Sequence, residues 1–215
     1  MPRDGRGSGL LAVLLHGGFW RAAYTCSLMA PLAIDLANRG WTTLNVEYRR
    51  IGCGGGVPET LDDVAAAIAA GVEHVRPART AVVGHSAGGH LALWAAAAPA
   101  VSAAVSLAGV ADLTAAARAG IGDGAAVEFA GGTPEERPDA YALADPMRRL
   151  PLTAPALLVH GDADDRVPVE LSRRYAAAAG PRCELLELPG VGHFEPILPR
   201  GAAWPLVVER LERLV

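Results

Sequence analysis

The fold is decided by the stretch Thr80-Ala81-Val82-Val83-Gly84-His85-Ser86-Ala87-Gly88-Gly89-His90. Its first residues are typical of a buried β-strand, and the residues from His90 onward are typical of a helix. Between them, residues 84–88 match the pattern G-x-S-x-G, in which a serine stands on a sharp turn from a strand into a helix. Glycine is needed on both sides of this turn because a Cβ there would collide with neighbouring backbone.

Stretches typical of strands alternate along the chain with stretches typical of helices. Apolar runs predict strands over residues 10–15, 41–48, 80–83, 103–108, 156–161 and 184–188. Apolar residues at helical spacing predict helices between them, and a capping box of Thr60 and Asp63 predicts the start of one helix. The alternation predicts one doubly wound, mostly parallel sheet with helices on both faces, in a single domain over residues 1–215. We expect residues 1–9 to be flexible and residues 110–150, where the pattern is weak, to form a small cap.

The composition argues against several classes of protein. Of the 215 residues, 51% are apolar, which is enough for a sizeable core. The net charge of −4, without any basic stripe, predicts no nucleic-acid partner. The apolar run over residues 10–15 is too short for a signal peptide or a membrane span, so we expect a cytoplasmic protein without membrane contact. Cys26, Cys53 and Cys183 are widely separated, which predicts neither a disulfide framework nor a metal site.

A serine hydroxyl is a weak nucleophile unless a base takes its proton and an acid orients that base. Reactive groups in parallel sheets gather beyond the carboxyl ends of the strands. His193 follows the last predicted strand in a glycine-flanked loop and is the expected base for Ser86. Asp162, Asp164 and Asp165 follow the preceding strand, and the residues alone leave open which of them is the acid. The order serine, aspartate, histidine is that of hydrolases with a G-x-S-x-G elbow.

Acyl transfer builds negative charge on a carbonyl oxygen, and backbone N–H groups can stabilise that charge. One expected donor is the N–H of Ala87, which follows the serine at the start of a helix. The other is the N–H of Gly18 or Phe19, in the loop after the first strand, and the choice between these two stays open. His16 is expected to brace this loop by hydrogen bonding.

Aromatic residues stand beside these loops. Phe19, Trp20 and Phe194 are expected to form an apolar wall of a substrate pocket. No histidine and carboxylate cluster has the spacing of a metal site, so we expect neither a metal nor a cofactor. The remaining histidines are expected to be structural: His74, His85, His90 and His160.

The chain resembles the α/β-hydrolase superfamily from Leu10 to Val215. The loop His16-Gly17-Gly18-Phe19-Trp20 is similar to the H-G-G-x-W oxyanion loop of the esterase and formamidase branch, which includes kynurenine formamidase-like proteins and small carboxylesterases. Residues 84–90 and 160–168 also resemble the catalytic domain of prolyl-oligopeptidase-type peptidases. In those families the acid stands four residues after the histidine that ends the strand, which implies Asp164 here.

The chain departs from the superfamily at its start. The superfamily usually begins with two strands before the strand that leads to the oxyanion loop, and this chain has at most nine residues there. We therefore expect N-terminal strands that are shortened or missing. An open sheet edge invites pairing, so the edge is expected to be truncated or covered by a second subunit in a homo-oligomer.

The resemblance implies a serine hydrolase that needs no cofactor and works through an acyl-enzyme. Its expected substrate is a small carboxylic ester or an activated amide, such as an N-formyl group. One alternative is an aminoacyl peptidase similar to the prolyl oligopeptidases, and another is a non-catalytic binding protein with the hydrolase fold. The presence of Ser86, Asp164 and His193 together argues against the second alternative.

Overall fold

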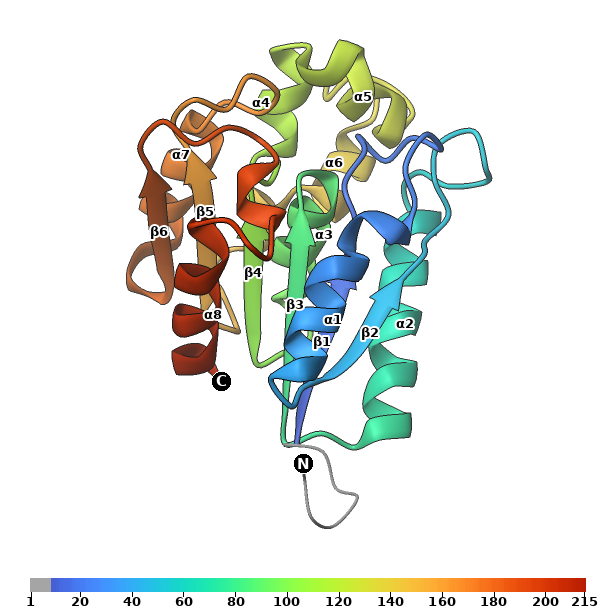
Figure 1. Cartoon of the computed structure of the whole chain (residues 1–215). Coiled ribbons are helices and arrows are strands. Elements are labelled where there is room, and N and C mark those ends of the chain that lie inside the picture. Colours follow the sequence, from blue (N-terminus) through green and yellow to red (C-terminus); the bar gives the residue numbers. More distant parts are fainter. Residues whose placement is uncertain (1–8) are drawn as a thin grey trace.

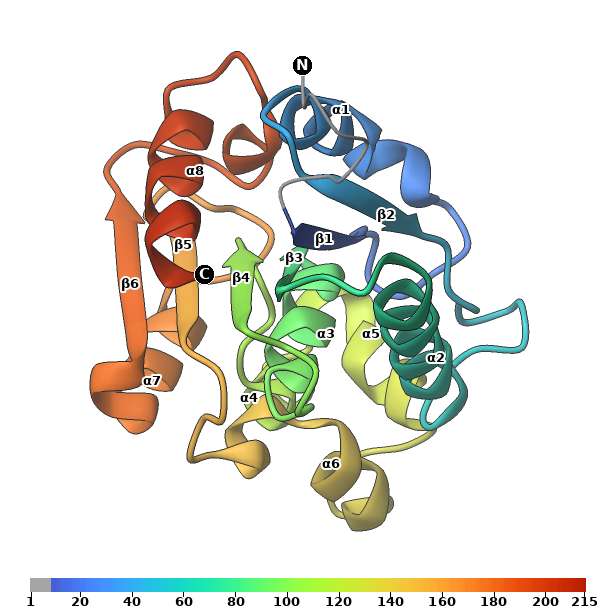
Figure 2. The ribbon, with the colours of Figure 1, turned by 90° about the horizontal axis from the view of Figure 1, so that it is seen from below.

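The computed structural model describes residues 9–215, which form a central six-stranded sheet with helices on both faces (Figures 1 and 2). All strand pairs are parallel, in the order β2-β1-β3-β4-β5-β6. This arrangement confirms the predicted fold class. The strands are β1 (Leu10–Leu15), β2 (Thr42–Val46), β3 (Arg79–His85), β4 (Ala103–Leu107), β5 (Ala156–Gly161) and β6 (Cys183–Leu188).

Helices connect each strand to the next by crossovers, and α8 follows the last strand. Helices α1 and α8 cover one face of the sheet, and α2, α3 and α7 cover the other (Figure 2). The α-helices are α1 (Ala30–Asn38), α2 (Glu59–Val75), α3 (Ala87–Ala95), α4 (Leu113–Arg118), α5 (Ile121–Ala130), α6 (Pro138–Ala144), α7 (Glu170–Ala179) and α8 (Ala203–Leu214). The short 3₁₀ helices are η1 (Cys26–Met29), η2 (Pro146–Arg149), η3 (Gly180–Arg182) and η4 (Glu195–Ile197).

Strand β1 shows why the central strands read as continuous apolar runs. Successive side chains of a strand point to opposite faces of the sheet. Leu11, Val13 and Leu15 pack into the core under α2 and α3, whereas Ala12 and Leu14 pack into the core under α1 and α8. A strand covered on both faces has no position for a polar residue, so the period-2 alternation of a half-exposed strand is absent.

The end of the second strand and the start of one helix differ from the prediction. The second strand ends at Val46 rather than at residue 48, because its partner β1 ends at Leu15, opposite Val46. The capping box of Thr60 and Asp63 does not form: α2 begins at Glu59, and Thr60 bonds the N–H of residue 56 and the carbonyl of residue 49. The side chain of Asp63 pairs with Arg49 instead.

The segment over residues 110–150, expected to be a small cap, contains α4, α5, α6 and η2. Figure 1 shows α4 and α5 beyond the carboxyl ends of the strands. Residues 1–9 were expected to be flexible, and residues 1–8 of this segment lie outside the described residues. Within the described part of the chain, β2 is an edge strand, and no helix is both long and apolar enough to cross a membrane.

The crossing of β1, β3 and α3 leaves no room for a side chain at two glycines. A Cβ added to Gly84 would lie 1.9 Å from the carbonyl oxygen of Gly88, and one added to Gly88 would lie 2.1 Å from that of Leu15. We expect Gly84→Ala to lower the free energy of unfolding by about 3 kcal/mol or more, because backbone must shift to admit the methyl group.

The matched control for this substitution is Gly40→Ala. Gly40 has φ +93° and open space around its Cβ position, so alanine there meets only backbone strain of about 1 to 2 kcal/mol. Urea unfolding of the two variants and the wild type measures both costs. Equal costs at residues 84 and 40 would contradict the steric explanation.

Candidate functional site

Ser86 stands between β3 and α3 in a backbone conformation that is rare for residues other than glycine. Its φ is +54° and its ψ is −117°. Its N–H donates to the carbonyl of Leu107 at 2.8 Å, and its carbonyl accepts from the N–H of His90 at 3.1 Å. The close packing at Gly84 and Gly88 leaves the chain no other path, which explains how the structure retains this strain.

The structure brings His193 and Asp164 together from the loops after β6 and β5. Nδ1 of His193 lies 2.7 Å from Oδ2 of Asp164, so Nδ1–H donates to the carboxylate and Nε2 is left for another partner. The Asp164 side chain is fully buried, and its Oδ1 accepts the N–H groups of Arg166 and Val167 at 2.8 and 2.9 Å. A carboxylate held by so many donors cannot rotate away from the histidine.

The other two aspartates of this loop have different partners. Asp162 accepts the N–H of Gly190 at 2.6 Å, which ties the loop after β5 to the loop after β6. The Asp165 side chain is 80% exposed and lies 3.5 Å from the guanidinium of Arg166. Of the three carboxylates that the sequence left open, Asp164 is the one that contacts the candidate base.

His160, expected to be only structural, is a second donor to Asp164. Its Nε2 lies 3.1 Å from Asp164 Oδ2 and 2.9 Å from the carbonyl of Val167, while its Nδ1 lies 2.7 Å from Oγ of Ser172. The two acceptors fix the proton on Nε2, so Nδ1 accepts from the serine. Burial would raise the pKa of Asp164, but hydrogen bonds from His160 and His193 lower it well below its usual range.

His85, next to the serine, contacts the loop that carries His193. Burial, together with the neighbouring His193, lowers the pKa of His85 to about 3, so the ring is neutral at physiological pH. Its Nε2–H donates to the carbonyl of His193 at 3.0 Å, and the two ring centroids are 4.7 Å apart. The elbow thus holds the backbone of the candidate base. Sequence reasoning missed this contact because it joins residues 108 positions apart.

Ser86 and His193 line the same small cavity, of about 80 Å³. The residues that line it come from the loop after β1, the elbow, and the loops after β5 and β6. They are Gly18, Phe19, Tyr24, Leu28, His85, Ser86, Arg166, His193 and Phe194.

The three aromatic residues that were expected to line a substrate pocket lie in two different places. Phe194 and Phe19 line this cavity, whereas Trp20 is buried away from it and stacks on Phe129, with ring centroids 4.6 Å apart. Trp20 turns inward because φ is positive at Phe19 and at Trp20 itself, at +52° and +57°. Among the described residues that line the cavity, none belongs to the predicted cap.

The loop after β1 packs directly against the elbow. A Cβ added to Gly17 would lie 2.9 Å from the Cβ of Ser86, so glycine lets the two segments approach. Within the described chain, the backbone N–H groups of Gly18, Phe19 and Ala87 donate to no protein acceptor. All three N–H groups are therefore free to bind an oxygen atom, and the alternatives Gly18 and Phe19 both stay open.

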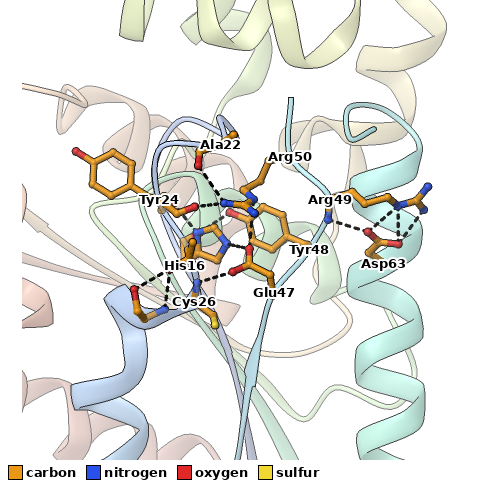
Figure 3. A network of polar contacts seen from close by, with 12 residues as sticks. His16, Ala22, Tyr24, Cys26, Glu47, Tyr48, Arg49, Arg50 and Asp63 are labelled. Atoms are coloured by element: carbon orange, nitrogen blue, oxygen red, sulfur yellow. Dashed lines mark hydrogen bonds and ion pairs between the residues drawn. The ribbon is translucent and has the colours of Figure 1, made fainter. Parts of the chain in front are cut away.

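His16, at the start of this loop, belongs to a polar network that Figure 3 shows. Its Nε2 lies 2.9 Å from Oε1 of Glu47, and its ring stacks on Tyr48 with centroids 4.3 Å apart. The sequence pointed to His16 but not to Glu47 or Tyr48, which are the last two residues of a predicted strand and directly follow β2 in the structure. Within the described residues, no group of three histidine, cysteine or acidic side chains is placed to hold a metal ion.

The parallel sheet, the serine elbow and the histidine and carboxylate loops at its carboxyl edge define an α/β-hydrolase fold. The sequence profile of the prolyl oligopeptidase family matches residues 33–195, and the chain belongs to this family. It is therefore a serine hydrolase of the α/β-hydrolase fold.

The chain is similar to individual proteins over most of its length. An uncharacterized protein of Mycobacterium tuberculosis is 32% identical over 207 residues, which cover 93% of this chain and 68% of that protein. Thermogutta terrifontis esterase 2, solved after phosphonylation by sarin, is 25% identical with a TM-score of 0.75, over 94% of this chain and 82% of that chain. A bifunctional GH43-CE protein of Bacteroides eggerthii is 22% identical with a TM-score of 0.82, and shows the fold alone. That alignment covers 96% of this chain but 34% of the bifunctional protein, about a third of its length.

We expect Asp164→Asn to lower the free energy of unfolding at neutral pH. We also expect the free energy of unfolding of this variant to change less than that of the wild type as the pH falls. The pKa of Asp164 in the fold is below the value of about 3.9 in an unfolded chain. The carboxylate therefore stabilises the fold fully above that pH, and this stabilisation is lost as the pH falls towards the folded-state pKa. We expect a loss of about 2 kcal/mol or more at pH 7 from the charged hydrogen bonds.

Urea unfolding between pH 7 and pH 3 measures this effect. The free energies of unfolding of the wild type and Asp164→Asn should approach each other as the pH falls. Asp165→Asn, which changes an exposed carboxylate of the same loop, should instead follow the wild type throughout. A wild-type advantage over Asp164→Asn that stays constant down to pH 3 would contradict the assignment.

Proposed function

We propose that this protein hydrolyses a small carboxylic ester or an activated amide, such as an N-formyl group, with Ser86 as nucleophile. The observation that carries the proposal is that Ser86 and His193 line one small cavity, while His193 is hydrogen-bonded to the buried Asp164. The serine hydrolase fold and the family support it, and so does the esterase relative that reacts with sarin.

The reaction follows from these positions. Oγ of Ser86 attacks the carbonyl carbon while Nε2 of His193 takes the hydroxyl proton. The C–O or C–N bond to the leaving group then breaks, and His193 returns the proton to the leaving oxygen or nitrogen. Water, deprotonated by the same histidine, attacks the acyl-enzyme and releases the acid and the free serine. Asp164 keeps the histidine proton on Nδ1 throughout and stabilises the imidazolium.

Negative charge on the carbonyl oxygen is stabilised by backbone donors. The N–H of Ala87 lies at the start of α3, where the helix dipole favours negative charge. The N–H of Gly18 or Phe19 is the second donor, from a loop that packs on the elbow. Each such donor contributes about a hundred- to a thousand-fold in rate.

The substrate is small on its acyl side. A cavity of about 80 Å³ is well below the roughly 300 Å³ or more of most ligand pockets, so a short acyl or formyl group suits it. The aromatic rings of Phe19, Tyr24 and Phe194 favour an apolar neighbour to the scissile bond. The H-G-G-x-W sequence of residues 16–20 supports the esterase and formamidase branch, whereas the family match also supports an aminoacyl peptidase.

Covalent labelling tests the nucleophile. We expect a fluorophosphonate probe to add to wild-type protein at Ser86, located by peptide mass mapping, and to leave Ser86→Ala unlabelled. Ester turnover by Ser86→Ala should fall by about ten thousand-fold or more. Equal labelling of both proteins, or none of either, would favour a binding protein that has the hydrolase fold without turnover.

Substrate comparison tests the reaction class. Turnover of p-nitrophenyl acetate and of N-formylkynurenine should exceed that of aminoacyl p-nitroanilides, because the latter need room for a bulkier acyl group. Ser86→Ala is the control for background hydrolysis in each assay. Turnover confined to the anilides would replace the proposal with the peptidase alternative.

A further inference from the structure

We propose that Glu47 is a positioning residue for the hydrolysis proposed above, because it fixes the loop that carries the second oxyanion donor. Glu47 contacts neither Ser86 nor the residues of the cavity wall in the described structure. Its carboxylate binds His16, at the start of the loop after β1, and the backbone N–H of Cys26, just beyond the end of that loop.

The sheet register brings Glu47 to this loop. Strands β1 and β2 are paired with Leu15 opposite Val46. The next residues on the two strands, His16 and Glu47, therefore leave the sheet side by side at its carboxyl edge, where Figure 3 shows their side chains in contact.

Both carboxylate oxygens of Glu47 bind donors from the loop region. Oε1 accepts Nε2–H of His16 at 2.9 Å and lies 3.3 Å from Nε of Arg50. Oε2 accepts the backbone N–H of Cys26 at 2.9 Å, and the side chain of Asn45 donates to the carbonyl of Cys26 at 2.8 Å. One carboxylate thus joins the beginning and the end of the segment over residues 16–26.

The contact with His16 fixes the first residue of the loop. The His16 ring is held flat on Tyr48, whose hydroxyl donates to the His16 carbonyl at 2.6 Å. Residues 17 and 18 follow at once, and Gly17 is the residue that packs on Ser86. A shift of His16 would therefore move the candidate donors relative to the serine.

Arg50 extends the same restraint to the far side of the loop. Its guanidinium, paired with Glu47, donates to the carbonyls of Ala22 and Tyr24. The ring of Tyr24 packs against Gly18, where an added Cβ would lie 2.6 Å from it. The pair Gly17-Gly18 is thus held between the elbow, which Gly17 contacts, and Tyr24, which Gly18 contacts.

The charge of Glu47 matters for these contacts. Burial would raise the pKa of Glu47, but the N–H of Cys26 and the pairing with His16 lower it, so the side chain is ionised at neutral pH. Burial lowers the pKa of His16, although both ring nitrogens face oxygen atoms. Nε2 faces the Glu47 carboxylate and Nδ1 lies 2.8 Å from the Gly17 carbonyl, and the carboxylate is the stronger acceptor.

The test compares Glu47→Gln with Asp63→Asn. Glutamine has an NH2 donor in place of one carboxylate oxygen, so it cannot accept both at the position that faces His16 and at the position that faces Cys26. Asp63 also pairs with an arginine, Arg49, at 2.8 Å, but has no contact with the loop (Figure 3). The measurements are kcat and KM for p-nitrophenyl acetate and p-nitrophenyl butyrate, with the melting temperature of each variant.

We expect Glu47→Gln to lower kcat by about ten- to a hundred-fold, less than the complete loss of a donor, with KM changed by about twofold at most. The factor should be the same for both esters, because the oxyanion is common to them. Glu47→Asp, which keeps the charge on a shorter side chain, should recover part of kcat, and Asp63→Asn should keep the wild-type kcat.

Four results would count against the proposal. A kcat of Glu47→Gln within about twofold of wild type would show that Glu47 has no positioning role. A loss confined to KM, or one that differs between acetate and butyrate, would show that Glu47 shapes the acyl pocket instead. A wild type that neither hydrolyses these esters nor is labelled at Ser86 would remove the proposed function and this role with it. Should Glu47→Gln not fold, a wild-type kcat in Glu47→Asp, despite its shorter reach, would count against the proposal.

Discussion

The whole site depends on the close approach of three backbone segments at the elbow. The carbonyls of Leu15 and Gly88 occupy the positions that side chains at Gly88 and Gly84 would need. This contact presses β1 and α3 against β3 and leaves Ser86 with a positive φ. The same packing brings the loop after β1 onto the serine, with Gly17 as the contact point. The positive φ of Ser86 and the close approach of the loop after β1 therefore have the same cause.

Parallel pairing supplies the rest of the arrangement. Because all six strands run in the same direction, the loops after β1, β2, β3, β5 and β6 emerge at one edge of the sheet. Groups separated by more than a hundred positions meet there, as the side chain of His85 and the backbone carbonyl of His193 do. Short hydrogen bonds between loops, such as the one from Gly190 to Asp162, then fix the loops relative to one another.

Most of the fold could be predicted from the sequence, because the two-sided burial of the strands leaves a direct signal in apolar runs such as residues 10–15 and 156–161. The elbow and the loop of His193 could also be located, since each directly follows such a run. The choice among three aspartates could not be made from the residues alone. It depends on the direction in which each side chain leaves the turn, with Asp162 directed to Gly190 and Asp165 to solvent.

The contacts that the sequence did not predict are those between the candidate site residues and the side chains that support them. In the sequence, His160 is the end of a predicted strand. In the structure, its contacts with Ser172 and the carbonyl of Val167 fix the ring proton on Nε2, which also faces Asp164. Glu47 looks like a surface charge, and only the pairing of Leu15 with Val46 brings it to His16. Each has a partner from another part of the fold: Glu47 binds His16, directly after β1, and His160 binds Ser172 of α7. Register and tautomer are properties of the assembled sheet, so a pattern within one segment cannot reveal them. Supporting contacts of this kind have to be sought beside each strand end, on the neighbouring strand.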